Sequence, residues 1–95
     1  MIDSNKSMNF YNEGDSFYRE GNYGEAVIRF AEAVKIDPHN YRAWHDKGLC
    51  LYKLGNYEEA INCYTEAIKL KPDNDTYWTN KGYSLYKHGN YEEAI

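Results

Sequence analysis

The sequence predicts an all-α protein built from stacked helix-turn-helix repeats, that is, an α-solenoid. A hexapeptide occurs three times at a spacing of 34 residues, as GNYGEA at 21–26 and as GNYEEA at 55–60 and 89–94. Between these copies, apolar residues recur at offsets of three and four, the spacing of one helix face. Prolines, where a helix cannot continue, stand late in both complete periods, at Pro38 and Pro72. A fixed period of this length is the signature of a repeat architecture.

The first half of each unit has the pattern of a helix. In the second unit the early aromatic residue Trp44 is followed by Gly48 and then by Leu51, at offsets of four and three that fall on one stripe. The stripe ends at a Gly-Asn pair, which is typical of a helix C-terminus followed by a turn. The equivalent residues in the other units are Phe10, Gly14 and Phe17, and Trp78, Gly82 and Leu85.

The second half of each complete unit has the pattern of another helix, ending near the proline. Its apolar face is Ala60, Tyr64 and Ala67 in the second unit, and Ala26, Phe30 and Ala33 in the first. Glycine on one helix and alanine on the other let the two backbones approach closely, while the aromatic side chains fill the remaining space. The predicted helices are 7–20, 24–37, 41–54, 58–71 and 75–88.

This order of aromatic residue, glycine, bulky apolar residue, alanine, aromatic residue, alanine and proline resembles the tetratricopeptide repeat family. The resemblance covers residues 7–95, or about two and a half repeats. It implies a right-handed superhelix in which the first helices of the units line a concave groove that binds a protein or peptide. The expected division is an N-terminal extension at 1–6, complete repeats at 7–40 and 41–74, and a truncated third repeat at 75–95.

The composition argues against other classes of partner. The formal net charge is −4, from 11 Lys and Arg against 15 Asp and Glu, so the chain has no general attraction to nucleic acid or anionic lipid. No apolar run approaches the length of a membrane span, and the first residues lack the apolar core of a signal peptide. We therefore expect a cytoplasmic protein with neither nucleic acid nor membrane as partner.

The sequence contains no pattern typical of an enzyme. His39, His45 and His88 have no ligand spacing to one another, to cysteine or to carboxylates, so we expect no metal site. Each Gly-Asn pair lies between two helices rather than after a strand, which excludes a phosphate-binding loop. Cys50 and Cys63 lack the CxxC spacing and stand among apolar neighbours, so we expect small buried apolar residues rather than a redox pair. We expect no catalysis and no cofactor.

The groove is the expected binding site, and the resemblance selects which helix faces line it. A tyrosine followed by a cation recurs with the 34-residue period, and tyrosine buries a large area at little entropic cost. These repeating tyrosines either contact a ligand or pack against the neighbouring helix. The candidate partner-binding residues are Tyr11, Asp15, Tyr18, Arg19, Arg42, Asp46, Leu49, Tyr52, Lys53, Asn80, Tyr83, Tyr86 and Lys87.

One activity of the family is not expected here. Co-chaperone members bind the acidic C-terminal tails of heat-shock chaperones through a clamp of lysine, arginine and asparagine side chains. None of the matching positions holds a cation, and two hold carboxylates that would repel a terminal carboxylate. These positions are Tyr11, Asp15, Asp46, Thr76 and Asn80. We therefore expect a mixed-charge ligand, or a basic one with aromatic residues, in place of a chaperone tail.

The last predicted helix carries the stripe Trp78, Gly82 and Leu85 without a full second helix to cover it. The chain is either an excerpt of a longer array, or a self-assembling module whose stripe is buried by another copy. Apolar patches of this kind usually find a partner. We therefore expect a homo-oligomer through this uncapped helix at high concentration, as the structural alternative to peptide binding.

Overall fold

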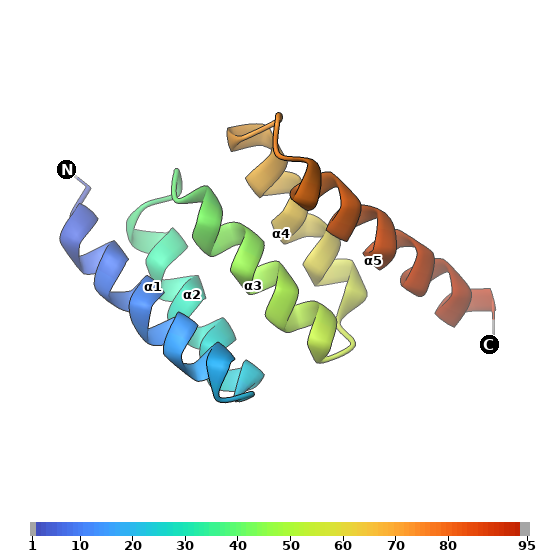
Figure 1. Ribbon diagram of the computed structural model, residues 1–95, viewed down its shortest axis with the longest axis horizontal. Coiled ribbons are helices and arrows are strands. Elements are labelled where there is room, and N and C mark those ends of the chain that lie inside the picture. The colour runs from blue at the N-terminus through green and yellow to red at the C-terminus, as the bar shows by residue number, and fades with distance from the viewer. Residues whose placement is uncertain (1, 94–95) are drawn as a thin grey trace.

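The computed structural model describes residues 2–93, and the side chains of residues 2–89. The first helices of the units (α1, α3 and α5) lie side by side, and the second helices (α2 and α4) lie behind them (Figure 1). This arrangement confirms the all-α solenoid of helix-turn-helix units. The helices of the described residues are α1 (Ser4–Arg19), α2 (Tyr23–Ile36), α3 (Tyr41–Lys53), α4 (Tyr57–Leu70) and α5 (Asp75–Glu93).

The two Gly-Asn turns within the complete units have the expected helix-ending geometry. Gly21 has a φ of 79° and Gly55 a φ of 84°, a left-handed conformation that glycine adopts without steric cost. The next amide closes the turn, since the Asn56 N–H donates to the Leu51 carbonyl at 2.8 Å. In the first unit the Asn22 side chain also accepts a hydrogen bond from the Glu25 N–H at 3.4 Å and so caps α2. The Gly-Asn pair therefore ends one helix and starts the next.

The two helices of each complete unit touch at the predicted glycine. A Cβ atom added to Gly14 would lie 2.7 Å from the ring of Phe30, and one added to Gly48 would lie 2.7 Å from the ring of Tyr64. Ala26 and Ala60 on the second helices are fully buried, as are both aromatic rings to within 1%. The close-contact face is thus confirmed for the first two units. Cys50 and Cys63 are also buried and free, as expected.

The first helix begins earlier than expected, at Ser4 rather than at residue 7. Asp3 supplies the N-cap, because its side chain accepts a hydrogen bond from the Lys6 N–H at 3.0 Å. Ser7, which marked the predicted start, is instead a buried residue within the helix. Its hydroxyl donates to the Ala33 carbonyl at 2.9 Å and so joins α1 to α2.

The predicted end of the last helix at residue 88 is wrong. α5 continues through Gly89 and Asn90 to Glu93. In the complete units the turn is held by a second helix whose aromatic residue packs on the first, as Tyr64 packs on Gly48. The described part of the third unit has no equivalent of Tyr64, so the Tyr-Glu-Glu segment extends the helix instead.

α5 has a buried and an open side. Tyr77 and Ser84 are 5% and 0% exposed and face the preceding helices, whereas Trp78 and Leu85 are each 51% exposed. A Cβ atom added to Gly82 would meet no atom within 4 Å. The uncovered stripe expected from the sequence is therefore present among the described side chains. None of the described helices is both long enough and apolar enough to cross a membrane.

Candidate functional site: the groove along the first helices

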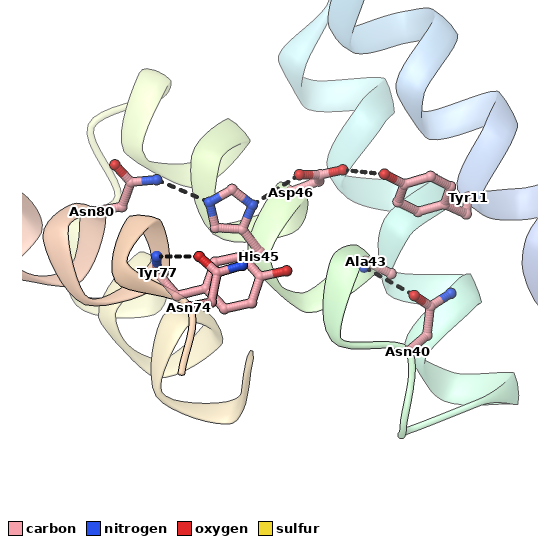
Figure 2. A network of polar contacts seen from close by, with 8 residues as sticks. All are labelled: Tyr11, Asn40, Ala43, His45, Asp46, Asn74, Tyr77 and Asn80. Carbon is pink, nitrogen blue, oxygen red and sulfur yellow. Dashed lines mark hydrogen bonds and ion pairs between the residues drawn. The ribbon is translucent and has the colours of Figure 1, made fainter. Parts of the chain in front are cut away.

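A chain of hydrogen bonds crosses the groove side and links all three first helices (Figure 2). The Tyr11 hydroxyl on α1 donates to Oδ2 of Asp46 on α3 at 2.6 Å. The other oxygen of that carboxylate lies 3.0 Å from Nδ1 of His45. Nε2 of His45 in turn lies 2.9 Å from the amide nitrogen of Asn80 on α5. Side chains from three successive units thus share one polar network.

The repeat positions these side chains at the same height on neighbouring helices. Within the network, each of the two hydrogen bonds that join different helices links residues 35 apart, which is one residue more than the 34-residue period. The starts of α3 and α5 are fixed by asparagine caps, since Asn40 and Asn74 accept hydrogen bonds from backbone amides at 3.2 Å. The Tyr77 ring stacks on the His45 ring, with 4.4 Å between the ring centroids, and so fixes the orientation of the imidazole.

Each hydrogen bond in the network has a donor and an acceptor when the His45 proton is on Nδ1. Nδ1–H then donates to Asp46, and Nε2 accepts from the Asn80 amide. Burial raises the pKa of the Tyr11 hydroxyl well above its ordinary value, and the hydrogen bond to Asp46 and the charge of that carboxylate raise it further. Tyr11 therefore remains a neutral donor to a charged acceptor, the stronger class of hydrogen bond.

Three residues of the network stand at positions that the resemblance matches to the carboxylate clamp of co-chaperones. Tyr11, Asp46 and Asn80 bond within the network, and Asp15 forms an ion pair with Arg19 at 3.0 Å. The fifth position, Thr76, is exposed and uncharged. The five positions themselves therefore hold two carboxylates and no cation, although Arg42 lies within electrostatic range of Tyr11 and Tyr77.

The lower groove, toward the C-terminal ends of the first helices, holds two adjoining clefts. The narrower has a volume of about 230 Å³ and the more open one about 640 Å³. Tyr52 and Tyr83 line both, and Tyr83 is 60% exposed. The other lining residues are Tyr18, Leu49, Lys53, Tyr64 and Asn80 in the narrower cleft, and Thr79, Gly82, Tyr86 and Lys87 in the open one.

The repeating tyrosines do not have equivalent surroundings. Tyr18 packs on Tyr23 at 5.6 Å between ring centroids, and Tyr52 packs on Tyr57 at 5.4 Å, so both are partly structural. Tyr86 is 65% exposed. Ligand contact and packing thus both have support for the repeating tyrosines, because Tyr18 and Tyr52 contact the second helix and also line a cleft.

The predicted site residues fall into three groups. Tyr11, Asp46 and Asn80 join the network, Asp15 and Arg19 share an ion pair, and most of the others line the two clefts. Among the described residues, no ion pair forms at the remaining cations Arg42, Lys53 and Lys87. The cleft-lining residues of the predicted set are Tyr18, Leu49, Tyr52, Lys53, Asn80, Tyr83, Tyr86 and Lys87.

The sequence reasoning missed Tyr77 as a member of the site. This residue stacks on His45 and contacts the Tyr41 ring at 6.4 Å. The signal in the sequence is that the 34-residue period aligns Tyr77 with the apolar residue Ala43. The structure buries both residues. Within the described part of the chain, no three side chains of histidine, cysteine or acidic type converge as metal ligands.

Comparisons with known proteins identify the family to which this helical-repeat protein belongs. A family model described as "Tetratricopeptide repeat" matches residues 11–61, and another described as "TPR repeat" matches residues 48–89. Because the first match covers more than half of the 95 residues, the chain belongs to the tetratricopeptide repeat family. Its five described helices amount to roughly two and a half repeats. A comparison with curated protein sequences finds no significant match.

Solved structures with the same fold include domains from human, yeast and plant proteins. The second TPR domain of human RPAP3, in complex with the HSP70 peptide SGPTIEEVD, has a TM-score of 0.86 and 24% identity, covering 94% of this chain and 74% of that one. The TPR2B domain of yeast Sti1 in its pHsp70 complex has a TM-score of 0.87 and 24% identity, with coverages of 96% and 73%. The Arabidopsis OM64 TPR domain has a TM-score of 0.88 and 20% identity, with coverages of 96% and 75%. At these identities the likeness shows the shared fold.

Proposed function

We propose that the chain is a non-catalytic protein-interaction module that binds an extended segment of a partner protein in the groove of α1, α3 and α5. The observation that carries the proposal is the pair of tyrosine-lined clefts that meet at Tyr52 and Tyr83. Such a site fits an aromatic or large apolar side chain of the ligand, since rigid amphipathic rings give large contact areas at low entropic cost.

The charges around the clefts favour a mixed-charge ligand. Lys53 borders the narrower cleft and Lys87 the open one, so an acidic side chain of the ligand next to its aromatic anchor would meet a cation. The other end of the groove carries the carboxylates of Asp15 and Asp46. A basic ligand residue is suited to that end.

The polar network argues against binding of a free acidic C-terminus. A terminal carboxylate placed where the clamp of the relatives would lie faces Asp46, whose lone pairs are engaged by Tyr11 and His45. A carboxylate there would suffer like-charge repulsion from Asp46. The peptides bound by human RPAP3 and yeast Sti1 are properties of those proteins. In this chain, the positions that the resemblance matches to the clamp hold no cation.

The network also argues against catalysis by the Asp-His pair. A general base needs a nucleophile or a substrate proton within hydrogen-bonding distance of its free ring nitrogen. Nε2 of His45 faces the Asn80 amide instead, and Tyr77 stacks on the ring. The pair therefore serves as a structural connection between units.

The test is a selection of random peptides for binding to the intact chain, followed by affinity measurements on the selected sequences. We expect internal aromatic residues with a nearby acidic residue, and no need for a free C-terminus. The variants Tyr52→Ala and Tyr83→Ala should each weaken binding at least about tenfold, as expected for aromatic anchors. Leu54→Ala is the matched control, since Leu54 is 48% exposed and lies outside both clefts.

Two results would contradict the proposal. One is tight binding of the free-acid peptide SGPTIEEVD that is lost when its C-terminus is amidated, because that would show a working carboxylate clamp. The other is selected peptides that bind Tyr52→Ala and Tyr83→Ala as well as they bind the parent, because the clefts would then not be the site.

A second candidate function is self-assembly of the chain. It is favoured by one observation, the half-exposed Trp78 and Leu85 on the open side of α5. Light scattering over a hundredfold range of concentration tests it, and a constant monomer mass across the range would exclude it.

A further inference from the structure

We propose that two copies of the chain associate through the open side of α5, in an antiparallel two-fold contact in which the helices cross at Gly82. This inference rests on the second candidate function and adds its geometry and its residues. The contact surface, called the α5 face below, consists of Trp78, Gly82, Leu85, Tyr86 and Gly89.

The α5 face is apolar and carries no charge along its length. At 3.6 residues per turn, Trp78, Gly82, Leu85 and Gly89 lie within about one sixth of the helix circumference, and Tyr86 borders them. Trp78 and Leu85 are 51% exposed and Tyr86 is 65% exposed, so half or more of each side chain is open to water. The flanking cation Lys81 lies over the Trp78 ring at 6.0 Å, at the edge of the face.

The face is complementary to itself when a second copy is turned antiparallel. Gly82 lies four residues after Trp78 and three to four before Leu85 and Tyr86. A two-fold axis at Gly82 therefore sets Trp78 of one copy opposite Leu85 and Tyr86 of the other. A Cβ atom on Gly82 would meet nothing within 4 Å in the monomer, so the glycine leaves room for a second helix backbone. The same device brings helices together at Gly48, where Tyr64 fills the space.

The opposite end of the molecule is not a suitable partner for the α5 face. The 34-residue period aligns Asn9 and Ser16 on α1 with the buried Tyr77 and Ser84 on α5, and both α1 residues are exposed. Glu13 on the same side of α1 and Glu20 directly after the helix are exposed carboxylates. Head-to-tail stacking would press these polar groups against the apolar α5 face, at a cost in desolvation.

The remaining exposed apolar residues do not form a competing surface. Ile2, Met8, Ile28 and Leu54 lie on four different segments, before α1, in α1, in α2 and after α3. Tyr83 is on α5 but lines the two groove clefts and not the α5 face. Scattered residues of this kind are normal on a soluble surface, whereas the large side chains Trp78, Leu85 and Tyr86 gather on the α5 face. The α5 face is therefore the apolar helical surface on which the α5 face of a second copy can pack.

The first experiment measures dimer formation by sedimentation equilibrium of the intact 95-residue chain. We expect a monomer–dimer equilibrium that persists at high salt, because no ion pair crosses the face. Leu85→Glu should weaken dimerisation at least about tenfold, since it buries an unpaired charge. Leu54→Glu is the matched control, with a leucine of nearly equal exposure (48%) elsewhere, and it should leave dimerisation unchanged.

The second experiment tests the crossing point. Gly82→Cys should form a covalent dimer on mild oxidation, because the two-fold axis brings the two introduced thiols within disulfide distance. Gly24→Cys is the control, since Gly24 is also an open helical glycine, and Cys50 and Cys63 are buried. A monomer at all concentrations would overturn both self-assembly and this geometry. Dimers that form without cross-linking of the Gly82→Cys variant, or that are insensitive to Leu85→Glu, would overturn the geometry alone.

Discussion

The pentapeptide Gly-Asn-Tyr-Glu-Glu occurs at 55–59 and again at 89–93, and its two copies have different conformations. In the second unit Gly55 has a φ of 84° and a new helix begins at Tyr57. In the third unit the same five residues continue α5 to Glu93. Since the local sequence is identical, the difference comes from packing. Tyr64 and its neighbours hold α4 against α3, whereas no described side chain covers the equivalent side of α5.

The comparison separates local preference from tertiary stabilisation. Glycine allows the turn, but the burial of an apolar second-helix face is what stabilises it. An isolated short helix gains too little from its own hydrogen bonds to fix a turn. The complete units and α5 should therefore respond differently to equivalent substitutions. The predictions below compare a substitution in a complete unit with a similar substitution on α5.

The largest difference is expected between buried and open aromatic residues. Phe30→Ala removes a ring that is fully buried and packed against Gly14, and should cost about 3–5 kcal/mol of unfolding free energy. Tyr83→Ala removes a ring that is 60% exposed, and should change stability by about 0.5 kcal/mol or less. Urea denaturation followed by circular dichroism measures both. Equal losses would show that α5 is covered to the same extent as α1.

The second contrast is at the repeating glycine. Gly48→Leu puts a large side chain where even a Cβ atom would lie 2.7 Å from the Tyr64 ring, and overpacking should cost about 1–3 kcal/mol or more. Gly82→Leu meets no neighbour and should gain roughly 0.5–1 kcal/mol, because glycine is a poor residue in the interior of a helix.

Thermal melts of the dilute monomer separate the two glycine variants. If Gly48→Leu melts like the parent protein, the close-contact face is wrongly assigned. If Gly82→Leu is destabilised as strongly as Gly48→Leu, then α5 is covered in solution at Gly82, in the way that α4 covers α3 at Gly48.

Most of the fold could be predicted because it depends on residues that repeat. The glycine and alanine positions at Gly14, Gly48, Ala26 and Ala60 follow from the period and from helix geometry. The structure confirms the close contacts of both glycines and the burial of both alanines. The end of α5 could not be predicted, because GNYEE reads as a turn wherever it occurs. Its conformation depends on a contact with another helix, which the pentapeptide does not contain.

The site could be predicted as a face but not as a set of contacts. Tyr11, Asp46 and Asn80 were each expected on the groove side from the resemblance. Their network could not be predicted, because it depends on side-chain conformations and on a one-residue offset from the period. Tyr77 was missed because the expected pattern assigned the aromatic role to Trp78, which turns to the open side.

The third contrast concerns hydrogen bonds of tyrosine hydroxyls. Tyr11→Phe removes the donor to Asp46 and leaves a partly buried carboxylate with one fewer partner, so it should cost about 1.5–3 kcal/mol. Tyr86→Phe changes a ring that is 65% exposed and should cost about 0.5 kcal/mol or less. Chemical denaturation at neutral pH measures both. A neutral effect of Tyr11→Phe would mean that the network contributes geometry but no stability.

The smallest expected effect is on how stability changes with pH, and it distinguishes the buried side of α3 from the buried side of α5. Burial raises the pKa of the Cys50 thiol from 9.0 to about 12, and the nearby Asp46 carboxylate raises it as well. The unfolded chain therefore loses this proton at lower pH than the folded chain does. The stabilisation is fully present below about pH 9 and is lost as the pH rises toward 12. At pH 10 the loss from this one group should be about 1 kcal/mol.

The 34-residue period gives this prediction an internal control, because Cys50 aligns with Ser84 on α5 and both residues are fully buried. Cys50→Ser should flatten the decline of melting temperature between pH 8 and pH 10, since serine does not ionise there. Cys63, Tyr11 and Tyr64, whose pKa values burial also raises, stay the same in both proteins and cancel in the difference. Ser84→Cys should steepen the decline, because it places a thiol at a position as buried as that of Cys50. If Ser84→Cys leaves the slope unchanged, the inner side of α5 opens before the complete units do. α5 would then be less stable than the complete units on its buried side, and the difference between the two regions would not be limited to its open side.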